Sequence, residues 1–560
     1  MTLKRAYIAA AIGGASLALA FPPMPLFLLA FVGLAAILFA FDEAPRKKYW
    51  VLWLGFFFYH AGANWWISSW REQTDPYLMA SGFALDLLHP FFFMVPFLGY
   101  SIAKRRLGRG AAIVAFPFLW TAFEYLHSLS DFSYPWLSVG ATQIYNRAWI
   151  QFIDITGIWG ASFLVALANS IIYIFLRQVK KRRDAADGIP LLDAAREAFK
   201  SSRANALLLI ALVGIYAIPA AYGFYALPKY GYESVAVRSK ESINIGLIQP
   251  AINPWQKWAG RGIYQINVHR HLQDSLKRAV PSLELAVWSE TSIPYINLNI
   301  NAYHEYDFLR HWLDTSRVSL LTGFSEFRFF DKKSAPPTAR ILFGDSNLIY
   351  EPYNAALMIN AAPFGGGAPQ IYRKSRLTPF AERFPHAEAL TFAQHWFQWG
   401  VGISSWGKGD AQYNLEYIDS NKSASIAPVI CIESIYPEFV SRFSRAGAGI
   451  IAIITNDAWY DYTIGPEQHY QLACLRAIEN RKFVVRCANT GVTGFIAPNG
   501  TSVLRAPQYE RTAIALTVPV MEGTSVYAVS RDAFAKLILA AALVIIGLSI
   551  YRKIQKREAK

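Results

Sequence analysis

The chain has 560 residues, of which 54% are hydrophobic and 15% aromatic, and it carries a formal net charge of +15. Its apolar residues lie mostly in long runs, which excludes an ordinary soluble protein and indicates membrane-spanning helices. No nucleic-acid-binding motif accompanies the basic charge, so we expect neither DNA nor RNA as a partner.

Eight apolar runs are long enough to cross a bilayer, seven of them before residue 230 and one near the C terminus. They cover residues 6–21, 25–41, 50–70, 79–103, 110–129, 155–176, 205–227 and 533–551. The first two are separated only by Pro22-Pro23-Met24 and could form a hairpin. Alternatively, the first is a signal peptide, because Lys4 and Arg5 precede it and Ala18-Leu19-Ala20 resembles a cleavage site. Cleavage there would leave the orientation of the later spans unchanged.

The charged residues between the spans predict the orientation. Alternate loops at 1–5, 42–49, 104–109 and 177–203, together with the tail at 552–560, hold 22 Lys and Arg but only 7 Asp and Glu. Basic loops stay on the cytoplasmic side of a membrane. We therefore expect both termini in the cytoplasm and the long segment between the last two spans outside it.

That long segment has the pattern of an α/β domain, in which apolar, β-branched runs alternate with helical stretches. The strand-like runs are Ile243–Ile248, Ser319–Phe324, Ala355–Ile359 and Ile450–Thr455, and the helical stretches lie near 258–279, 302–315 and 466–481. We predict a transmembrane bundle at 1–230, an α/β catalytic domain at 231–525, and a terminal membrane helix with a basic cytoplasmic tail at 526–560.

Three short strands predicted in this domain end at residues that carry chemistry, which are Glu290, Lys374 and Cys431. Each has a structural explanation when taken singly, as a solvated charge or a core thiol. Together they supply a nucleophile, a base that takes its proton and a cation that stabilises an oxyanion. Glu382 lies across a turn from Lys374. A helix begins near Tyr436-Pro437-Glu438, and we expect its N terminus to stabilise a Cys431 thiolate.

The other two cysteines are Cys474 and Cys487, in a helix-like and a strand-like stretch. We expect both to be core thiols, although the extracytoplasmic location leaves a disulfide between them as an alternative.

The α/β segment also contains a series of short motifs. They are Trp288-Ser289-Glu290, Tyr372-Arg373-Lys374, Pro379-Phe380-Ala381-Glu382, Ile430-Cys431-Ile432-Glu433, Thr455-Asn456-Asp457-Ala458-Trp459-Tyr460, Gly465-Pro466 through His469, Arg476-Ala477, Glu479, Arg486, Asn489 and Gly491-Val492-Thr493. In the membrane part, Tyr134-Pro135-Trp136-Leu137 precedes Gln143. With these motifs, nearly the whole chain resembles the apolipoprotein N-acyltransferases, the membrane-integral branch of the nitrilase (carbon–nitrogen hydrolase) superfamily.

The resemblance implies an αββα sandwich and an acyl transfer at the bacterial inner membrane, with the catalytic domain in the periplasm. A fatty acyl chain would pass from a phospholipid to a cysteine thioester, and then to the α-amine of the diacylglyceryl-cysteine of an apolipoprotein, without a cofactor or a metal. It implies Glu290 as general base, Lys374 as oxyanion stabiliser and Cys431 as nucleophile.

The resemblance also implies supporting roles for Glu382 and Glu433 near the thiol, and for Trp258 as a substrate contact. The chain departs from the family pattern at three places, which are Pro250-Ala251, Ala381 and Ile432. These departures affect the expected lining of the acyl pocket and not the three catalytic residues.

Two other functions fit parts of the sequence. A membrane-tethered amidase would use the same residues with water as the acceptor, but a tether needs only one span. A transporter could use Asp86 and Glu124 in its ion pathway, since intramembrane charge is costly, but the sequence shows no repeat. No HExxH or paired-Cys spacing indicates a metal site.

Overall fold

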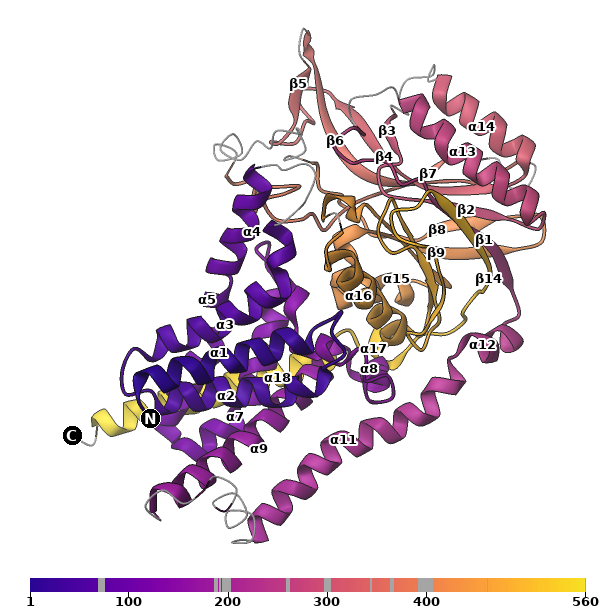
Figure 1. Ribbon diagram of the computed structural model, residues 1–560. Helices are drawn as coiled ribbons and strands as arrows, with labels where there is room; N and C mark the ends of the chain where they lie inside the picture. The colour runs from indigo at the N-terminus through magenta and orange to yellow at the C-terminus, as the bar shows by residue number, and fades with distance from the viewer. Residues whose placement is uncertain are drawn as a thin grey trace.

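The computed structural model describes residues 1–68, 76–185, 190, 193, 203–257, 262–296, 304–342, 345–362, 367–390, 406–460 and 462–558. In this part of the chain, a bundle of helices is joined to an α/β domain (Figure 1). The last helix, α18, leaves the α/β domain and runs back along the bundle, so that the N and C termini lie together at the far end (Figure 1).

Apolar helices and short 3-10 turns build the bundle. The helices are α1 (Leu3–Ala20), α2 (Ala30–Glu43), α3 (Lys48–Asn64), α4 (Pro76–Leu88), α5 (Pro90–Phe93), α6 (Val95–Leu107), α7 (Arg109–Leu129), α8 (Ile153–Thr156), α9 (Ile158–Ala185), α11 (Arg203–Lys229) and α18 (Ala533–Glu558). The turns are η1 (Phe27–Leu29), η2 (Trp65–Ser68), η3 (Pro135–Leu137), η4 (Val139–Gln143) and η5 (Trp149–Phe152).

Six described segments are long and apolar enough to cross a membrane, two fewer than the sequence predicted. They are Leu3–Ala20, Met79–Leu107, Arg109–Leu129, Ile158–Ala185, Asn205–Lys229 and Ala533–Gln555. The two that fall short are α2, with 14 residues, and α3, with 17. Pro22, Pro23 and Pro25 keep the start of the second apolar run out of a helix, because proline lacks the amide hydrogen that a helix needs.

Helix α1 packs closely against both short helices. A Cβ atom on Gly14 would lie 1.8 Å from the backbone oxygen of Gly55 in α3, and one on Gly13 would lie 2.6 Å from that of Gly33 in α2. Small residues allow helix backbones to approach in this way. In this structure α1 therefore packs as one of the helices of the bundle.

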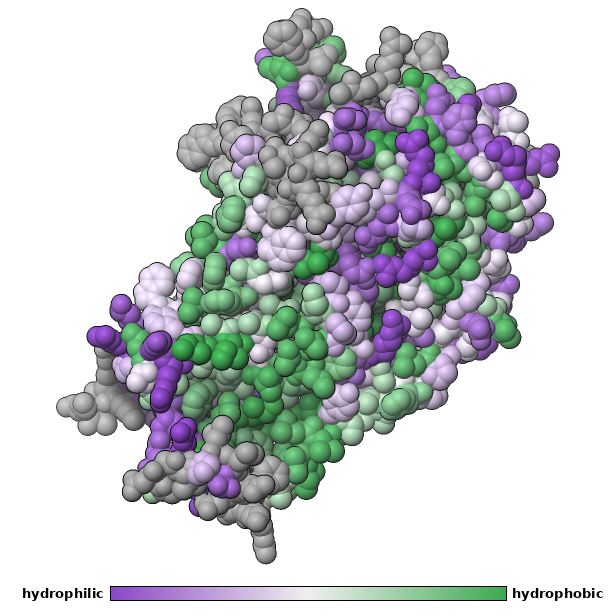
Figure 2. All heavy atoms as spheres, in the orientation of Figure 1, coloured by the Kyte–Doolittle hydropathy of each residue, from purple (hydrophilic) through white to green (hydrophobic). Residues whose placement is uncertain are grey.

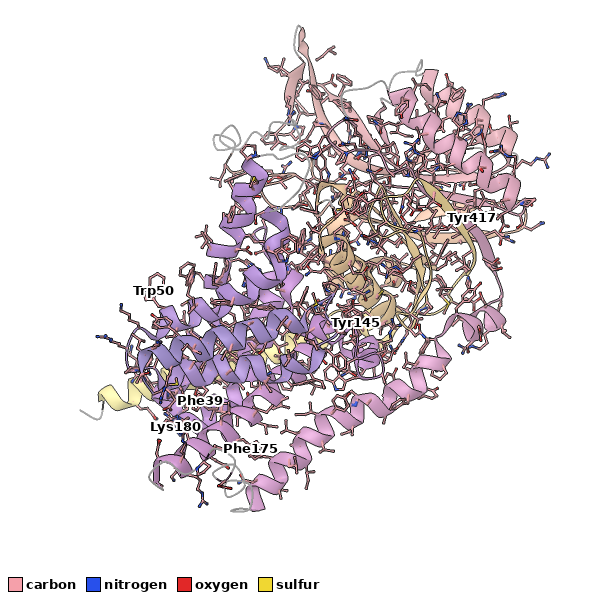
Figure 3. All side chains as sticks on the ribbon, in the orientation of Figure 1. Phe39, Trp50, Tyr145, Phe175, Lys180 and Tyr417 are labelled. Atoms are coloured by element: carbon pink, nitrogen blue, oxygen red, sulfur yellow. The ribbon has the colours of Figure 1, made fainter. Side chains whose placement is uncertain are left out.

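Charged residues gather at the end of the bundle farthest from the α/β domain. The Lys104 amine lies 2.7 Å from the Asp42 carboxylate, and Arg177 and Lys180 lie 2.5 and 3.5 Å from Glu43. Figure 2 shows an apolar belt between this charged end and the mixed surface of the α/β domain. Figure 3 shows Lys180 at the charged end, with Tyr417 far away in the α/β domain.

Two sheets form the α/β domain. The first has the strand order β14-β1-β2-β4-β6-β5, with β3 paired to β4 and β7 to β6, and the second has the order β13-β12-β11-β10-β9-β8. The first-sheet strands are β1 (Ser242–Gln249), β2 (Leu285–Trp288), β3 (Ile293–Ile296), β4 (Ser319–Phe330), β5 (Arg340–Leu342), β6 (Asp345–Ile359), β7 (Gln370–Arg373) and β14 (Thr512–Pro519). The second-sheet strands are β8 (Leu415–Ile418), β9 (Ser423–Ile430), β10 (Ile450–Thr455), β11 (Phe483–Ala488), β12 (Gly494–Ile496) and β13 (Ser502–Arg505).

Helices cover the outer faces of both sheets (Figure 1). They are α13 (Gly262–Ala279) and α14 (His304–Ser316) on the first sheet, and α15 (Pro437–Arg445) and α16 (Gly465–Asn480) on the second. The helices α12 (Tyr232–Arg238) and α17 (Val526–Ser530) connect the domain to the bundle, and the turns η7 (Cys431–Ile435) and η8 (Asp457–Tyr460) follow two strands. The arrangement is the expected αββα sandwich.

Alternation along the strands separates two cores. Ile245 and Val287 belong to the core shared with the second sheet, which includes Ile453. Ile248 and Trp288 belong to the core beneath the outer helices. The predicted strands and helices of this domain are all present. β4 extends beyond its predicted C-terminal end and β6 beyond its predicted N-terminal end. The other predicted ends that fall on described residues lie within one residue of the observed ones.

Glu124, a candidate for an ion pathway, has a structural role in this fold. Its carboxylate accepts hydrogen bonds from the Trp120 indole at 2.8 Å, the Ser138 hydroxyl at 2.8 Å and the Val139 amide at 2.9 Å. It therefore fixes the turn after α7 to the bundle.

Candidate active site

The ends of three strands bring the predicted residues together. Glu290 lies two residues after β2, Lys374 directly after β7, and Cys431 directly after β9. All three follow the strand ends that the sequence predicted.

Lys374 is the centre of a buried charge cluster. Its side chain is 1% exposed, and its amine donates to Oε1 of Glu290 at 3.2 Å and to Oε1 of Glu382 at 2.8 Å. Burial by itself lowers the pKa of Lys374, but the carboxylates of Glu290 and Glu382 and the nearby Cys431 outweigh it and raise that pKa well above its usual value. The amine therefore keeps its positive charge beside the thiol.

Glu290 is held from both sides of its carboxylate. Oε1 accepts from the Asn354 amide at 2.7 Å, in addition to Lys374, and Oε2 accepts from the backbone N–H of Asn456 at 2.9 Å. Asn354 also donates to Glu382 at 3.2 Å, so one amide orients two carboxylates. Glu382 is fixed further by the backbone and hydroxyl of Thr378, at 2.8 and 2.9 Å.

Cys431 adopts a left-handed backbone conformation, with φ of 50°. This region is unfavourable for a residue with a Cβ, and such strain is typical of functional positions. Cys431 is the first residue of the turn η7, which precedes α15, so stabilisation of its thiolate by the N terminus of α15 stays a prediction. Burial and the Glu290 charge raise the pKa of the thiol. Lys374 opposes this shift without reversing it, so the thiol needs a base.

Glu433 connects the loop after Lys374 to the strand before Cys431. Its Oε1 accepts from the Tyr372 hydroxyl at 2.7 Å and from the backbone N–H of Ser375 at 2.8 Å, and its Oε2 accepts from the N–H of Ile430 at 2.9 Å. Burial raises the pKa of Glu433 to about 7, against these hydrogen bonds. Glu433 thus fixes the backbone on both sides of the site, whereas Glu382 contacts the Lys374 amine itself.

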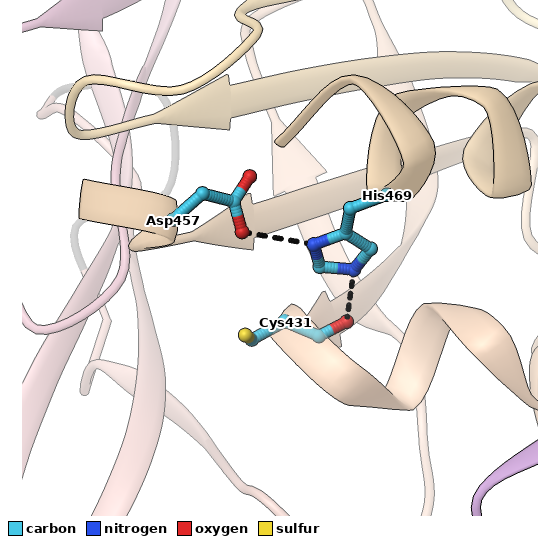
Figure 4. Close-up of side chains that lie close together, drawn as sticks. All are labelled: Cys431, Asp457 and His469. Atoms are coloured by element: carbon cyan, nitrogen blue, oxygen red, sulfur yellow. Dashed lines mark hydrogen bonds and ion pairs between the residues drawn. The ribbon is translucent and has the colours of Figure 1, made fainter. Parts of the chain in front are cut away.

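A second polar cluster lies behind the nucleophile (Figure 4). Cys431, Asp457 and His469 each place one potential metal ligand within 4.8 Å of the others. However, Asp457 already accepts from His469 at 2.9 Å, from Thr455 at 2.9 Å and from Arg486 at 2.5 Å. Burial by itself raises the pKa of Asp457, but His469 and Arg486 lower it by more, so the pKa falls to about 2. The cluster is therefore satisfied without an ion, and its imidazole contacts the Cys431 carbonyl oxygen at 3.2 Å (Figure 4).

The remaining predicted residues have different outcomes. Trp258, the predicted substrate contact, lies outside the described residues. Cys474 and Cys487 are buried and free, as expected for core thiols, and the alternative disulfide is absent.

Sequence reasoning did not assign a role to two residues of the site, Asn354 and Lys257. The buried Lys257 amine donates to the backbone oxygen of Glu290 at 3.0 Å and to the Thr291 hydroxyl at 2.7 Å. For Asn354, the sequence offered one signal, which is a polar residue within a predicted strand region. Lys257 had no signal, because a lysine is usually exposed.

A buried carboxylate–amine pair beside a strand-end cysteine, on an αββα sandwich, defines a thiol-dependent enzyme of the nitrilase type. Residues 244–535 match the model of the carbon-nitrogen hydrolase family, and residues 13–171 match that of the apolipoprotein N-acyltransferase N-terminal domain. The chain therefore belongs to the carbon–nitrogen hydrolase family, and its N-terminal match places it with the membrane-integral members, which confirms the resemblance seen in the motifs.

Named relatives agree along the whole chain. An apolipoprotein N-acyltransferase of Chlorobaculum tepidum is 29% identical over 98% of both chains. One of Geobacter metallireducens is 28% identical over 98% of this chain and 96% of its own. Among solved structures, the nitrilase-superfamily protein Nit3 of Saccharomyces cerevisiae is 16% identical, covers 50% of this chain and 91% of its own, and has a TM-score of 0.37. With its apolar helices, the protein is a multi-pass bacterial membrane enzyme.

Proposed function

We propose that this enzyme moves a fatty acyl chain from a phospholipid, through a thioester on Cys431, to the α-amine of the diacylglyceryl-cysteine of an apolipoprotein. The observation that carries the proposal is the Glu290–Lys374–Glu382 cluster beside Cys431, in a domain joined to a membrane bundle. The relatives named apolipoprotein N-acyltransferase, which match 98% of this chain, support N-acylation of an apolipoprotein.

In the first half-reaction, Glu290 takes the proton of the Cys431 thiol, and the thiolate attacks the ester carbonyl of the phospholipid. Lys374 stabilises the oxyanion of the tetrahedral intermediate. The intermediate then expels the lysophospholipid alkoxide, which receives the proton from Glu290. The acyl group remains on sulfur as a thioester.

In the second half-reaction, the neutral α-amine of the lipoprotein attacks the thioester carbonyl. Glu290 takes a proton from the amine, and the second oxyanion is again stabilised by Lys374. Collapse forms the amide and releases the thiolate, which recovers its proton from Glu290. A thiol suits this exchange because it is both a good nucleophile and a good leaving group.

Glu382 and Glu433 act as positioning residues in this scheme. Glu382 holds the Lys374 amine, and Glu433 holds the backbone beside Lys374 and Cys431. Trp258 is proposed as a substrate contact on the family pattern alone.

The proposed orientation places the α/β domain in the periplasm and both termini in the cytoplasm. It is supported by the basic loops and by the position of both termini at the charged end of the bundle, away from the α/β domain (Figure 1). Fusions of a periplasm-active reporter after Leu227 and after Lys560 should give opposite signals. Equal signals would contradict the orientation.

The decisive experiment separates the two half-reactions. The purified protein is incubated with acyl-labelled phospholipid alone, and we expect a hydroxylamine-sensitive acyl-enzyme that Cys431→Ala does not form. Cys474→Ala and Cys487→Ala are matched controls that should still form it. Addition of a diacylglyceryl-cysteine peptide should then move the label to the peptide. Release of free fatty acid without transfer to the amine would instead support a membrane-tethered hydrolase.

A further inference from the structure

A hollow lies between the bundle and the α/β domain, beside the catalytic loop. It is small, with a volume of about 40 Å³, and is partly open. One wall is the loop that follows α7, with Ser130 and Asp131, and another is the loop that follows β7, with Ser375 and Arg376. The hollow therefore joins the end of a membrane helix to the residues directly after Lys374.

The position along α7 places this hollow at the depth of lipid headgroups. Ser130 directly follows Leu129, the last residue of a candidate membrane span. Leu126 and Leu129 are 48% and 49% exposed, and Phe132 is 44% exposed. Apolar side chains exposed at the end of a span face the lipid, and the polar residues that follow them lie at the membrane surface.

The cationic side chains of the hollow differ in how they are paired. Arg383 lies 2.7 Å from the Glu388 carboxylate, and the Lys408 amine lies 3.9 Å from Asp131. The Arg376 guanidinium lies over the ring of Tyr436, 5.3 Å from its centre. Among the described residues, it has no carboxylate within ion-pair distance. An arginine fork of this kind matches the geometry of a phosphate.

The backbone of Arg376 is fixed to the catalytic site. Its N–H donates to Glu433 at 3.2 Å, beside the N–H of Ser375 at 2.8 Å, and Lys374 is two residues away. In a glycerophospholipid, only the three-carbon glycerol unit separates the phosphate from the acyl esters. A phosphate at Arg376 would therefore bring an ester carbonyl into the neighbourhood of Lys374.

We propose that Arg376 binds the phosphodiester of the acyl donor in this hollow, and so distinguishes the donor from the acceptor. This inference rests on the proposed function, because it assigns a site to the donor of that reaction. The acceptor, a diacylglyceryl-cysteine, has no phosphate. Arg376 should consequently act in the first half-reaction and have no part in the second.

The test compares two acyl donors in the full-length protein and in Arg376→Gln. One donor is a phospholipid, and the other is an activated aryl ester of the same fatty acid, which has no phosphate. With phospholipid, thioester formation should become roughly 10- to 100-fold slower at subsaturating donor, as expected for the loss of a charged hydrogen bond. With the aryl ester, and in the transfer of a preformed thioester to the peptide, the rates should stay within about twofold of the parent rates.

Two further variants keep the result interpretable. Arg376→Lys retains the charge without the fork and should lose less than Arg376→Gln with phospholipid. Arg278→Gln removes an exposed arginine from α13, away from the bundle, and should change neither rate. Equal losses with both donors, or a loss in the transfer step, would overturn the inference, as would parent rates with phospholipid in Arg376→Gln. If the parent itself forms no thioester with phospholipid, the proposed function fails instead.

Discussion

The side chain of Gln468, on α16 of the α/β domain, donates a hydrogen bond of 2.8 Å to the backbone oxygen of Pro22, between α1 and α2 of the bundle. The same nitrogen donates to the Ala63 oxygen at 2.9 Å. Its amide oxygen accepts from the indoles of Trp66 and Trp136, at 3.0 and 2.9 Å. One buried amide thus holds three segments of the bundle against the catalytic domain.

The first prediction concerns this junction. Gln468→Ala leaves buried donors and acceptors without partners, each at a cost of about 1–3 kcal/mol. We expect a lower thermal unfolding midpoint in detergent, corresponding to roughly 2–4 kcal/mol. Gln471→Ala is the matched control, because Gln471 lies on the same helix and donates to Glu467 of that helix, at 2.7 Å. Equal midpoints for the two variants would contradict the role of Gln468.

Asn354 provides the second prediction. Asn354→Ala removes the amide that orients Glu290 and Glu382, so thioester formation should slow by roughly 10- to 100-fold. Asn354→Asp should be slower still, because it places a third carboxylate against the other two. Mass spectrometry of the acyl-enzyme over time measures both rates.

A neighbouring asparagine supplies the control for this prediction. Asn360 directly follows β6, the strand that contains Asn354, but its side chain bonds to the backbone of Glu416 and Ile418 instead of the site. Asn360→Ala should keep the parent rate of thioester formation. A rate for Asn354→Ala equal to that of Asn360→Ala would show that the amide has no part in catalysis.

The third prediction uses the pKa of the nucleophile. Burial and Glu290 raise the pKa of Cys431, so its thiol is protonated at neutral pH. Glu290→Gln should slow thioester formation by roughly 10²–10⁴-fold at neutral pH, the usual effect of losing a general base. Its residual rate should then rise about tenfold for each pH unit, because the thiolate fraction does so below the thiol pKa. A residual rate that is flat with pH would exclude Glu290 as the base.

Lys257 leads to a prediction about stability. Burial lowers the pKa of its amine from 10.5 to about 7, although Glu290 opposes the shift. Between these values the unfolded chain binds more protons than the folded one, so Lys257 makes stability rise with pH across this window. The cost of the buried amine is fully present below pH 7 and vanishes towards pH 10.5.

Lys257→Met removes this pH dependence. Relative to the parent, the unfolding midpoint of the variant should be highest near pH 7 and should fall as pH rises. Lys482 provides a comparison, since burial lowers its pKa only to about 8, and Lys482→Met should show the same trend over a narrower window. A difference that does not change with pH would show that Lys257 is charged in the folded protein across the range.

The part of the candidate site that depends on local sequence, namely the residues at the ends of strands, was predictable. Glu290, Lys374 and Cys431 each lie at the end of a strand, and the ends of strands in an α/β domain tend to meet, so their positions along the chain indicated a shared site. The predicted strands appeared for the same reason, because a β-branched apolar run is stable only when it is buried in a sheet. The membrane-spanning helices were predicted less well. In the second predicted span, three prolines delay the start of the helix, so that α2 has only 14 residues.

The sequence by itself therefore determined the two-part architecture, the αββα pattern and the three residues at the strand ends. Only the tertiary structure decided what surrounds them. Asn354 and Lys257 reach Glu290 across 64 and 33 positions, and Gln468 reaches Pro22 across 446. A hydrogen bond over such a separation depends on how sheets and helices pack, and it leaves no periodic signal in the chain. The same holds for the thiol pKa, because burial and neighbouring charge set it, and both exist only once the chain has folded.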